Sequence, residues 1–214
     1  MFAVRGLTRE DAASFPENIN DYTLSEALDN CMGTPVLIDT TASDKTIGHC
    51  KKVLERGGFV IMSNKKPLSD TSELFADIVN GYPGKVYFET TVGAGLPVIH
   101  TLQNLIDSGE RIDSISGCFS GTLGYVCSAM EAGMSYSEAI TGAKEKGYTE
   151  PDPRDDLSGL DVARKALILA RLTGNTTCEV SDIQLEPFYD ESLKDLPVDE
   201  FMKRLPEQDS RYKN

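Results

Sequence analysis

Short apolar runs alternate with longer amphipathic stretches through the first half of the chain. Each run has three or four residues, mostly β-branched, aliphatic or aromatic, which is typical of buried strands. The runs occupy residues 36–38, 59–62 and 86–88. The stretches at residues 46–56 and 69–79 predict helices, the second capped by Ser69 or Asp70. Strands that alternate with helices predict a parallel, helix-covered sheet and an α/β fold.

After residue 91 the pattern becomes mainly helical. Four helices are predicted there, and a further helix precedes the first strand; the five occupy residues 23–31, 97–106, 121–130, 136–146 and 157–172. Residues 112–119 predict one more strand, and Gly147 is expected to end its helix in a left-handed conformation. Residues 148–156 predict an acidic loop stiffened by prolines. The acidic remainder offers aromatic anchors for a core, namely Phe188, Tyr189 and Phe201.

Composition narrows the possible partners. The 214 residues include 21 Lys and Arg against 34 Asp and Glu, which gives a net charge of −13. Such a surface repels phosphate backbones and anionic lipids, which argues against nucleic-acid and membrane partners. No apolar run approaches the roughly 20 residues that span a bilayer, and no signal peptide is recognised, so we expect a cytoplasmic location. Five widely spaced cysteines without a C-x-x-C pair predict buried reduced thiols rather than disulfides or a zinc site.

The first candidate for chemistry is the acidic loop after Gly147 together with the helix that follows it. Five carboxylates and three cations lie within residues 147–165. One interpretation is structural: the loop carboxylates favour a helix N-terminus, and Asp161 and Lys165 form an i,i+4 pair that contributes a few tenths of a kcal/mol. The other is catalytic: the helix is apolar on several sides, so its charged stripe would face a cleft. A shielded lysine there exchanges a proton near neutral pH, and a carboxylate one turn away holds the substrate.

The second candidate lies at the carboxyl ends of the first two predicted strands. Residues 40–43, which include Thr41, follow the first strand, and residues 63–67, which include Lys65, follow the second. Ligands of open parallel sheets bind at this end, so these loops predict a nucleotide cleft; an ordinary basic turn is the alternative. The turn at residues 93–95 has the form G-x-G but lacks the third glycine of a dinucleotide-binding turn, so it is weak evidence for a phosphate site.

Four stretches occur in an order and at intervals typical of one enzyme family. They are Asn64-Lys65-Lys66, Glu89-Thr90-Thr91-Val92-Gly93-Ala94-Gly95-Leu96-Pro97, Phe119-Ser120-Gly121-Thr122-Leu123, and Gly147 to Lys165. From about Pro35 to Gly174 the chain resembles homoserine dehydrogenase. The resemblance implies an oxidoreductase of threonine and methionine biosynthesis that interconverts aspartate 4-semialdehyde and homoserine with NADPH or NADH. It also implies a partial Rossmann-like parallel sheet in residues 1–88, followed by an α+β catalytic and dimerisation domain in residues 89–214, and a homodimer.

The matched positions carry the roles that the family implies. Lys165 matches the proton donor to the aldehyde oxygen, and Lys65 matches a second active-site lysine near the nicotinamide and the substrate. Positions that match substrate-binding residues are Glu150, Asp156, Asp161, Gly121 and Thr122. Positions that match contacts to the dinucleotide are Thr41, Lys65 and Gly147. Positions that match a monovalent-cation site, commonly sodium, are Glu89 and the carbonyl groups of Val92, Ala94 and Leu96. Such hard oxygen ligands suit a hard cation, so the turn at residues 93–95 is interpreted as an ion loop.

The chain departs from the family at both ends. The family's opening strand, glycine turn and first helix have no counterpart here, and neither does its later glycine-rich segment. We therefore expect the polypeptide alone to bind NADPH weakly and to have little or no activity. Three interpretations stay open: part of an active dehydrogenase, a shortened non-catalytic relative that binds or dimerises, and a chain completed by a separate polypeptide.

Overall fold

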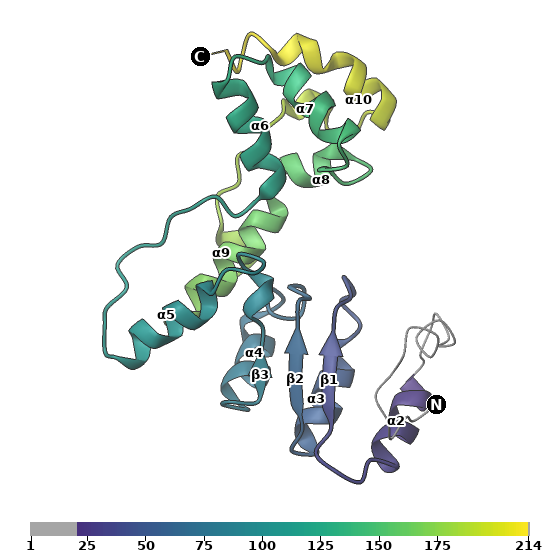
Figure 1. Cartoon of the computed structure of the whole chain (residues 1–214), viewed down its shortest axis with the longest axis vertical. Helices are drawn as coiled ribbons and strands as arrows, with labels where there is room; N and C mark the ends of the chain where they lie inside the picture. The colour runs from purple at the N-terminus through teal and green to yellow at the C-terminus, as the bar shows by residue number, and fades with distance from the viewer. Residues whose placement is uncertain (1–20, 214) are drawn as a thin grey trace.

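The computed structural model describes residues 21–213, which form a part built on a sheet and a part built from helices (Figure 1). In chain order the helices and strands are α2 (Asp21–Asp29), β1 (Val36–Asp39), α3 (Ile47–Glu55), β2 (Phe59–Met62), α4 (Ser72–Phe75), β3 (Val86–Tyr87), α5 (Val98–Asp107), α6 (Gly121–Glu131), α7 (Tyr136–Glu145), α8 (Pro153–Leu157), α9 (Leu160–Leu172) and α10 (Val198–Arg204). Short π-helical or 3₁₀-helical turns complete the set: η1 (Ala76–Asn80), η2 (Glu89–Thr91), η3 (Val180–Asp182), η4 (Glu191–Leu193) and η5 (Leu205–Gln208).

The three strands form a parallel sheet in the order β1-β2-β3. Val36 pairs with Phe59, and Ile61 pairs with Tyr87. A helix connects each strand to the next, α3 between β1 and β2 and α4 between β2 and β3. The sheet confirms the α/β class and the partial Rossmann-like arrangement expected from the sequence.

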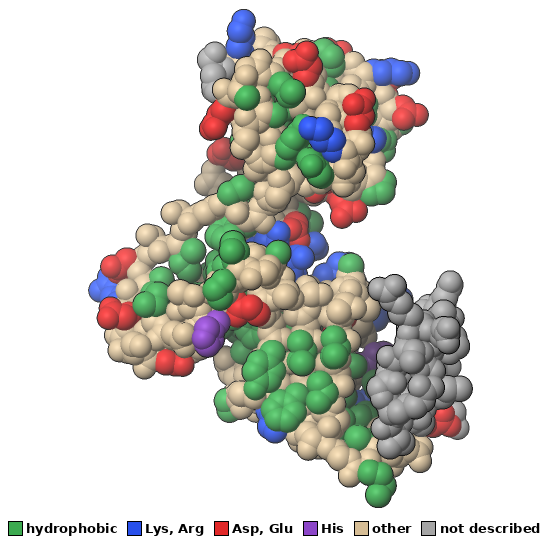
Figure 2. Space-filling view, viewed as in Figure 1, with side chains coloured by type: hydrophobic (Ala, Val, Ile, Leu, Met, Phe, Trp, Pro, Cys, Tyr) green, Lys and Arg blue, Asp and Glu red, His purple; other side chains and the backbone are tan. Residues whose placement is uncertain are grey.

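The two faces of this sheet have different surroundings. One face lies in a core with α3, α4 and η1, to which the following residues contribute: Val53, Val60, Met62, Phe75 and Ile78. The other face is uncovered: Val36, Ile38, Ile61 and Tyr87 are between 43% and 65% exposed. Figure 2 shows apolar side chains gathered over the sheet on this side. Parallel sheets are usually covered on both faces, whereas the described residues cover only one, so the expectation of a helix-covered sheet is met on one side.

The helix after β2 begins later than the sequence suggested. The Thr71 hydroxyl accepts the N–H of Leu74 at 3.3 Å and caps α4. Ser69 is buried, and its hydroxyl instead donates to the carbonyl oxygen of Lys65 at 3.0 Å. The prediction that Ser69 or Asp70 caps this helix is therefore wrong, because the residues after Lys65 form a turn of their own.

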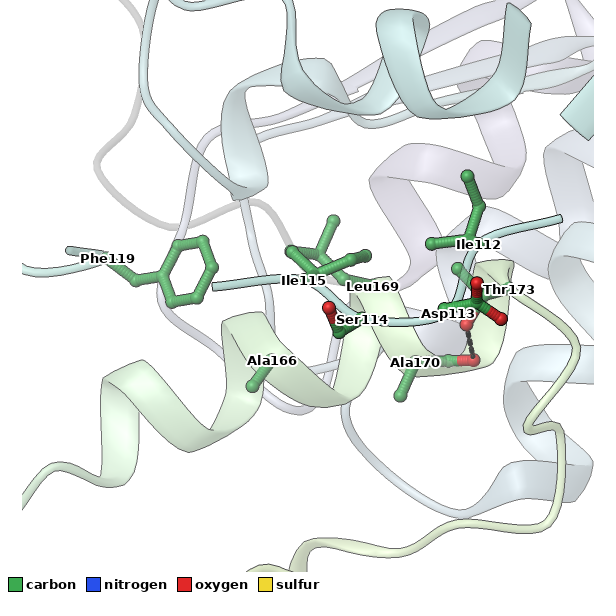
Figure 3. Close-up of a pocket in the computed structure, with 9 residues that line it drawn as sticks. All are labelled: Ile112, Asp113, Ser114, Ile115, Phe119, Ala166, Leu169, Ala170 and Thr173. Atoms are coloured by element: carbon green, nitrogen blue, oxygen red, sulfur yellow. Dashed lines mark hydrogen bonds between the residues drawn. The ribbon is translucent and has the colours of Figure 1, made fainter. Parts of the chain in front are cut away.

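Residues 112–119 do not form the predicted strand. The segment runs as an extended stretch beside α9, and within the described residues its backbone joins no strand ladder (Figure 1). Figure 3 shows Ile115 and Phe119 of this segment with Leu169 of α9 around a cavity of about 200 Å³. A strand needs a neighbouring strand to bond its N–H and C=O groups, and residues 21–213 supply no such neighbour here.

A short helix closes the acidic loop before the long helix begins. The Asp152 carboxylate accepts the N–H of Arg154 at 3.0 Å and caps α8, with Pro153 at the first helical position. Gly159 then adopts φ +75°, a left-handed conformation that glycine takes at little cost. The chain turns there, so α9 starts at Leu160, three residues later than predicted.

The helical part has its own core between α6, α7, α8 and α10. Its buried members are Val126, Tyr136, Ala139, Ile140, Ala143, Leu157, Tyr189, Leu193, Phe201 and Leu205. Phe188 packs against this core, so the prediction of Phe188, Tyr189 and Phe201 as anchors is confirmed.

The core of the sheet extends beyond the sheet itself. Val92, Ile99 of α5 and Ile168 of α9 belong to it, so the second half of α9 packs with the sheet part. Its first turns lead from the helical part, and α9 therefore connects the two (Figure 1). The division into residues 1–88 and 89–214 stays a prediction.

All five cysteines are free, but the expectation of burial holds only in part. Cys50 is buried, whereas Cys31, Cys118 and Cys127 are exposed. None of the helices within residues 21–213 combines the length and the apolar character required to cross a bilayer.

Candidate active site

Two lysines share one carboxylate between the sheet and α9. Asp161 and Lys165 lie one turn apart on α9, and Lys165 Nζ is 2.7 Å from Asp161 Oδ2. Lys65, in the loop after β2, brings its Nζ to 3.3 Å from Asp161 Oδ1. Lys165 also donates a hydrogen bond to the carbonyl oxygen of Phe119 at 2.6 Å. The fold thus joins two candidate constellations that are far apart in the sequence.

The three charged groups are shielded from solvent to different degrees. The side chain of Lys165 is 16% exposed, that of Lys65 28%, and that of Asp161 46%. The Lys165 ammonium is therefore held inside the site rather than in bulk water. Burial raises the pKa of Asp161, but the hydrogen bond and charge of Lys165 and the charge of Lys65 outweigh burial, so this pKa lies below its ordinary value. Asp161 is a carboxylate at neutral pH and holds both ammonium groups.

A second polar network connects α6 to the acidic loop. The Thr122 hydroxyl lies 2.6 Å from the carbonyl oxygen of Tyr148 and 2.9 Å from Asp156 Oδ1. Asp156 Oδ2 accepts the backbone N–H of Glu150 at 2.8 Å. Asp156 therefore braces the loop, while the Glu150 side chain itself is exposed. Of the predicted substrate residues, Thr122, Asp156 and the Glu150 backbone lie together.

Two glycines beside this network face open space. Gly147 adopts φ +70° after α7, which confirms its expected left-handed conformation. Gly121 is the first residue of α6, whose N-cap Ser120 accepts the N–H of Leu123 at 3.1 Å. A Cβ atom at Gly121 or Gly147 would meet no neighbour within 4 Å. Both positions therefore leave room beside the polar groups.

Asp39, a residue that the sequence did not single out, organises the strand ends. It is 3% exposed at the end of β1, and its Oδ1 accepts the N–H and the hydroxyl of Thr41 at 2.9 and 2.8 Å. Its Oδ2 accepts the hydroxyl of Thr46 at 2.7 Å and the amide of Asn64 at 3.0 Å. Burial raises the pKa of Asp39, but these hydrogen bonds together lower it below the ordinary value. The sequence contains a feature that points to Asp39, because this aspartate ends the strand and hydroxyl residues follow it directly.

Asp39 connects the loops that carry Thr41 and Lys65. Asn64 is 2% exposed and also donates to the carbonyl oxygen of Ser43 at 2.6 Å. Because Lys65 follows Asn64 directly, the position of its backbone is fixed relative to Thr41.

Glu89 lies at the N-terminus of α5. Its Oε1 and Oε2 accept the N–H groups of Ile99 and His100, both at 2.9 Å. The residue that precedes α5, Pro97, provides no side-chain cap, so Glu89 satisfies these amides and its charge complements the helix dipole. This is a structural role that the sequence did not suggest.

The turn after Glu89 is tightly folded. Gly93 and Ala94 have φ of +84° and +51°, and the carbonyl oxygen of Leu96 accepts the N–H of Val98 at 2.9 Å. Val92 is fully buried. The cation site at Glu89, Val92, Ala94 and Leu96 stays a prediction.

A small parallel sheet whose strand-end residues meet a lysine–aspartate pair defines an α/β protein of the Rossmann-like class. A family model described as homoserine dehydrogenase matches residues 97–213, more than half of the chain. The chain is 40% identical to a bifunctional aspartokinase/homoserine dehydrogenase of Haemophilus influenzae over 97% of its own length and 26% of that protein. It is 40% identical to a homoserine dehydrogenase of Emericella nidulans over 96% of its own length and 58% of that protein.

Solved structures share the fold of this chain. A crystal structure of a protein of unknown function from Candida auris matches with a TM-score of 0.87 and 30% identity, over 95% of this chain and 60% of that one. A hyperthermophilic archaeal homoserine dehydrogenase mutant in complex with NADPH matches with a TM-score of 0.63 and 28% identity. This match covers 73% of the present chain and 49% of the archaeal chain. The chain belongs to the homoserine dehydrogenase family, as its motifs indicated, and spans between about a quarter and 58% of the curated relatives named.

Proposed function

We propose that this protein interconverts aspartate 4-semialdehyde and homoserine with a nicotinamide cofactor, and that Lys165 exchanges the proton with the substrate oxygen. The observation that carries the proposal is the placement of Lys165, 16% exposed, against Asp161 and opposite Lys65 of the strand-end loop. Of the relatives described above, one is a homoserine dehydrogenase and the other a bifunctional aspartokinase/homoserine dehydrogenase, and the archaeal homoserine dehydrogenase mutant is in complex with NADPH.

The strand-end residues fit one end of a nicotinamide cofactor. The Thr41 hydroxyl, held by Asp39, and the Lys65 ammonium, held by Asp161, come from neighbouring loops at the carboxyl end of the sheet. The Lys65 ammonium suits the sugar and amide oxygens of a dinucleotide, and the Thr41 hydroxyl, whose proton goes to Asp39, offers its oxygen as an acceptor. When bound, the cofactor supplies the hydride that adds to the aldehyde carbon. We assign Thr41, Lys65 and Gly147 to its binding, and the choice between NADPH and NADH stays open.

The carboxylates of the acidic loop, together with Asp161 of α9, suit the ammonium or hydroxyl group of the substrate. We assign Glu150, Asp156 and Asp161 to this role, with Gly121 and Thr122 lining the same pocket. The bracing of the loop through Thr122 and Asp156 supports the assignment, because a fixed loop holds a substrate at lower entropic cost.

Lys165 then acts as a general acid in the direction of reduction. As hydride reaches the aldehyde carbon, electron density moves onto the oxygen, and an N–H of the Lys165 ammonium transfers its proton there. Lys165 becomes a neutral amine and regains a proton from solvent. Asp161 keeps a positive partner throughout, because Lys65 is 3.3 Å from its other oxygen. The negative charge is therefore not left unpaired in the site.

Further parts of the proposal concern assembly and ions. We propose that residues 112–119 pair with the same segment of a second copy, because their backbone joins no ladder within the described chain.

We assign a monovalent cation, sodium in the first instance, to the turn after Glu89. The proposed location of the protein is the cytoplasm. A binding or dimerising module without catalysis is the alternative.

The test replaces Lys165 with Met and measures oxidation of the reduced cofactor by aspartate 4-semialdehyde at saturating cofactor, so that weak binding does not hide the chemistry. We expect kcat to fall by about 10²- to 10⁴-fold with little change in KM, since a general acid acts in the transition state. Lys203→Met, at an exposed position of α10, is the matched control and should leave kcat unchanged. A near-normal kcat in Lys165→Met contradicts the assignment. An unsubstituted protein that binds the reduced cofactor and the substrate but does not convert them favours the alternative.

A further inference from the structure

A buried arginine joins α9 to the loop that carries Lys65. Arg171 is the largest fully buried side chain within residues 21–213, at 2% exposed. It lies on α9, ten positions beyond Asp161, which at 1.5 Å per residue is about 15 Å along the helix. A charged side chain in such a position needs partners for every donor, so its contacts reveal what it holds together.

The guanidinium group of Arg171 bonds to two segments outside α9, the turn at residues 68–70 and residues 178–179. Its Nη1 donates to the carbonyl oxygen of Leu68 at 2.9 Å, and its Nη2 donates to that of Asp70 at 2.7 Å. Its Nε donates to the carbonyl oxygen of Cys178 at 3.1 Å. Glu179 Oε2 accepts from Nη2 at 2.9 Å and balances the charge.

The segment that Arg171 holds is a closed turn that begins at Lys65. The carbonyl oxygen of Lys65 accepts the N–H groups of Leu68 and Ser69 at 3.1 and 3.0 Å, and the Ser69 hydroxyl at 3.0 Å. Leu68 is fully buried. A displacement of Leu68 is therefore transmitted to Lys65 through these hydrogen bonds.

This turn is consequently attached to α9 at two points. Arg171 binds the carbonyl groups of Leu68 and Asp70, and the side chain of Lys65 reaches back to Asp161. Two attachments along one helix fix the orientation of the turn as well as its distance. The attachment at Arg171 is buried, whereas the one at Asp161 is partly open to solvent and has to accommodate substrate.

We infer that Arg171 is a positioning residue that sets the place of Lys65 relative to Asp161 and Lys165. The inference rests on the proposed function for its catalytic consequence but not for its geometry. Arginine suits the task because its planar group offers five donors in fixed directions, whereas lysine has three donors on one atom. Glu179 supports it, because its Oε1 also accepts the N–H of Ser72 at 2.7 Å and connects α4 to the same group.

The first experiment measures the position of Lys65 without any need for activity. Arg171→Met and Arg171→Lys are labelled with a limiting amount of acetic anhydride under native conditions, and acetylation of Lys65 is quantified by peptide mass spectrometry. We expect Lys65 to react several-fold faster in Arg171→Met and to an intermediate extent in Arg171→Lys. Exposed Lys203 is the internal reference, and Arg204→Met, which removes an arginine paired with Glu207 on the surface, is the matched control.

If Arg171 only stabilised the fold, its replacement would leave the acetylation rate of Lys65 unchanged in molecules that are still folded. Unaltered Lys65 labelling in a variant with the circular dichroism spectrum of the unsubstituted protein therefore overturns the inference. Where Arg171→Met does not fold, Arg171→Lys decides by the same criterion.

The second experiment separates this inference from the proposed function. In the active protein, at a temperature where the variants are fully folded, we expect kcat to fall by about 10- to 100-fold in Arg171→Met, with partial rescue in Arg171→Lys. Faster acetylation of Lys65 in the variant, together with an unsubstituted protein that binds the reduced cofactor and the substrate without converting them, rejects the dehydrogenase but keeps the positioning role. An active protein whose Arg171→Met variant keeps its kcat and its Lys65 labelling rejects the positioning role alone.

Discussion

Asp39 offers the sharpest test of how the sheet prepares the site, because its environment differs so much from that of a surface carboxylate. It is 3% exposed and accepts four hydrogen bonds from Thr41, Thr46 and Asn64. In Asp39→Ala the Thr46 hydroxyl and one N–H of the Asn64 amide lose this acceptor, at about 1–3 kcal/mol each, while the other N–H of Asn64 keeps the carbonyl oxygen of Ser43. The N–H and the hydroxyl of the exposed Thr41 can bond to water instead, and one buried negative charge disappears. A net loss of about 3 kcal/mol follows.

Asp39→Asn removes the charge of Asp39 but keeps one acceptor oxygen, so it separates these two contributions to the free energy of unfolding. One oxygen still accepts from Thr41, but the new amide nitrogen faces the Asn64 amide, so two donors meet. We expect a loss of about 1–3 kcal/mol in the free energy of unfolding, measured by urea denaturation. At about 2–4 °C per kcal/mol for a chain of this size, Asp39→Ala should lower Tm by roughly 6–12 °C. Asp44→Asn, the same change at an exposed position in the same loop, should change Tm very little.

The effect of pH gives an independent check. Because the folded-state pKa of Asp39 lies below its unfolded value of about 3.9, its stabilisation is fully present above that pH and is lost as the pH falls through the folded-state pKa. The stability difference between the unsubstituted protein and Asp39→Asn should therefore narrow below about pH 4. The reasoning is refuted if Asp39→Asn unfolds within about 0.5 kcal/mol of the unsubstituted protein and the difference does not depend on pH.

Three further predictions concern the cofactor, the turn after Glu89 and the assembly. The 214-residue polypeptide should bind NADPH weakly in a calorimetric titration, because the described residues contain no glycine turn for the pyrophosphate; tight stoichiometric binding would contradict this. Gly93→Ala should lower the free energy of unfolding by about 1–3 kcal/mol, since Gly93 has φ +84° and a Cβ atom would lie 2.6 Å from Val98 Cγ2. Gly95→Ala, where a Cβ atom meets nothing within 4 Å, is its control, and equal losses at both positions would refute the steric argument. Sedimentation should show a dimer that Ser114→Pro dissociates, because proline removes a strand N–H; a monomeric unsubstituted protein would reject the strand pairing.

The sequence by itself determined the local elements and the family. Runs of β-branched residues indicate strands directly. Because the strands are parallel, the loops that follow β1 and β2 lie at the same edge of the sheet, as the sequence predicts. The pair Asp161 and Lys165 followed from helical periodicity alone, because residues four apart always share a face. The motifs around them were sufficient to identify the family.

The errors fall where the hydrogen-bond partners of a residue cannot be read from its own side chain. Residues 112–119 have strand-like side chains, but whether they form a strand depends on a neighbour that local pattern cannot supply. Ser69 has a good capping side chain, but its hydroxyl is committed to Lys65, and Thr71 takes the cap. In the first case the lack of a neighbouring strand within the described residues decided the outcome, and in the second a competing local turn did.

Only the tertiary structure decided how the site is assembled. Lys65 meets Asp161, Arg171 meets Leu68, and Asp39 meets Asn64, each across a long separation in sequence. Spacing along a helix or strand fixes which side chains share a face, because that is a property of the backbone repeat. Which faces then come together depends on how the helices pack on the sheet, and only there do buried polar groups find the partners that they require.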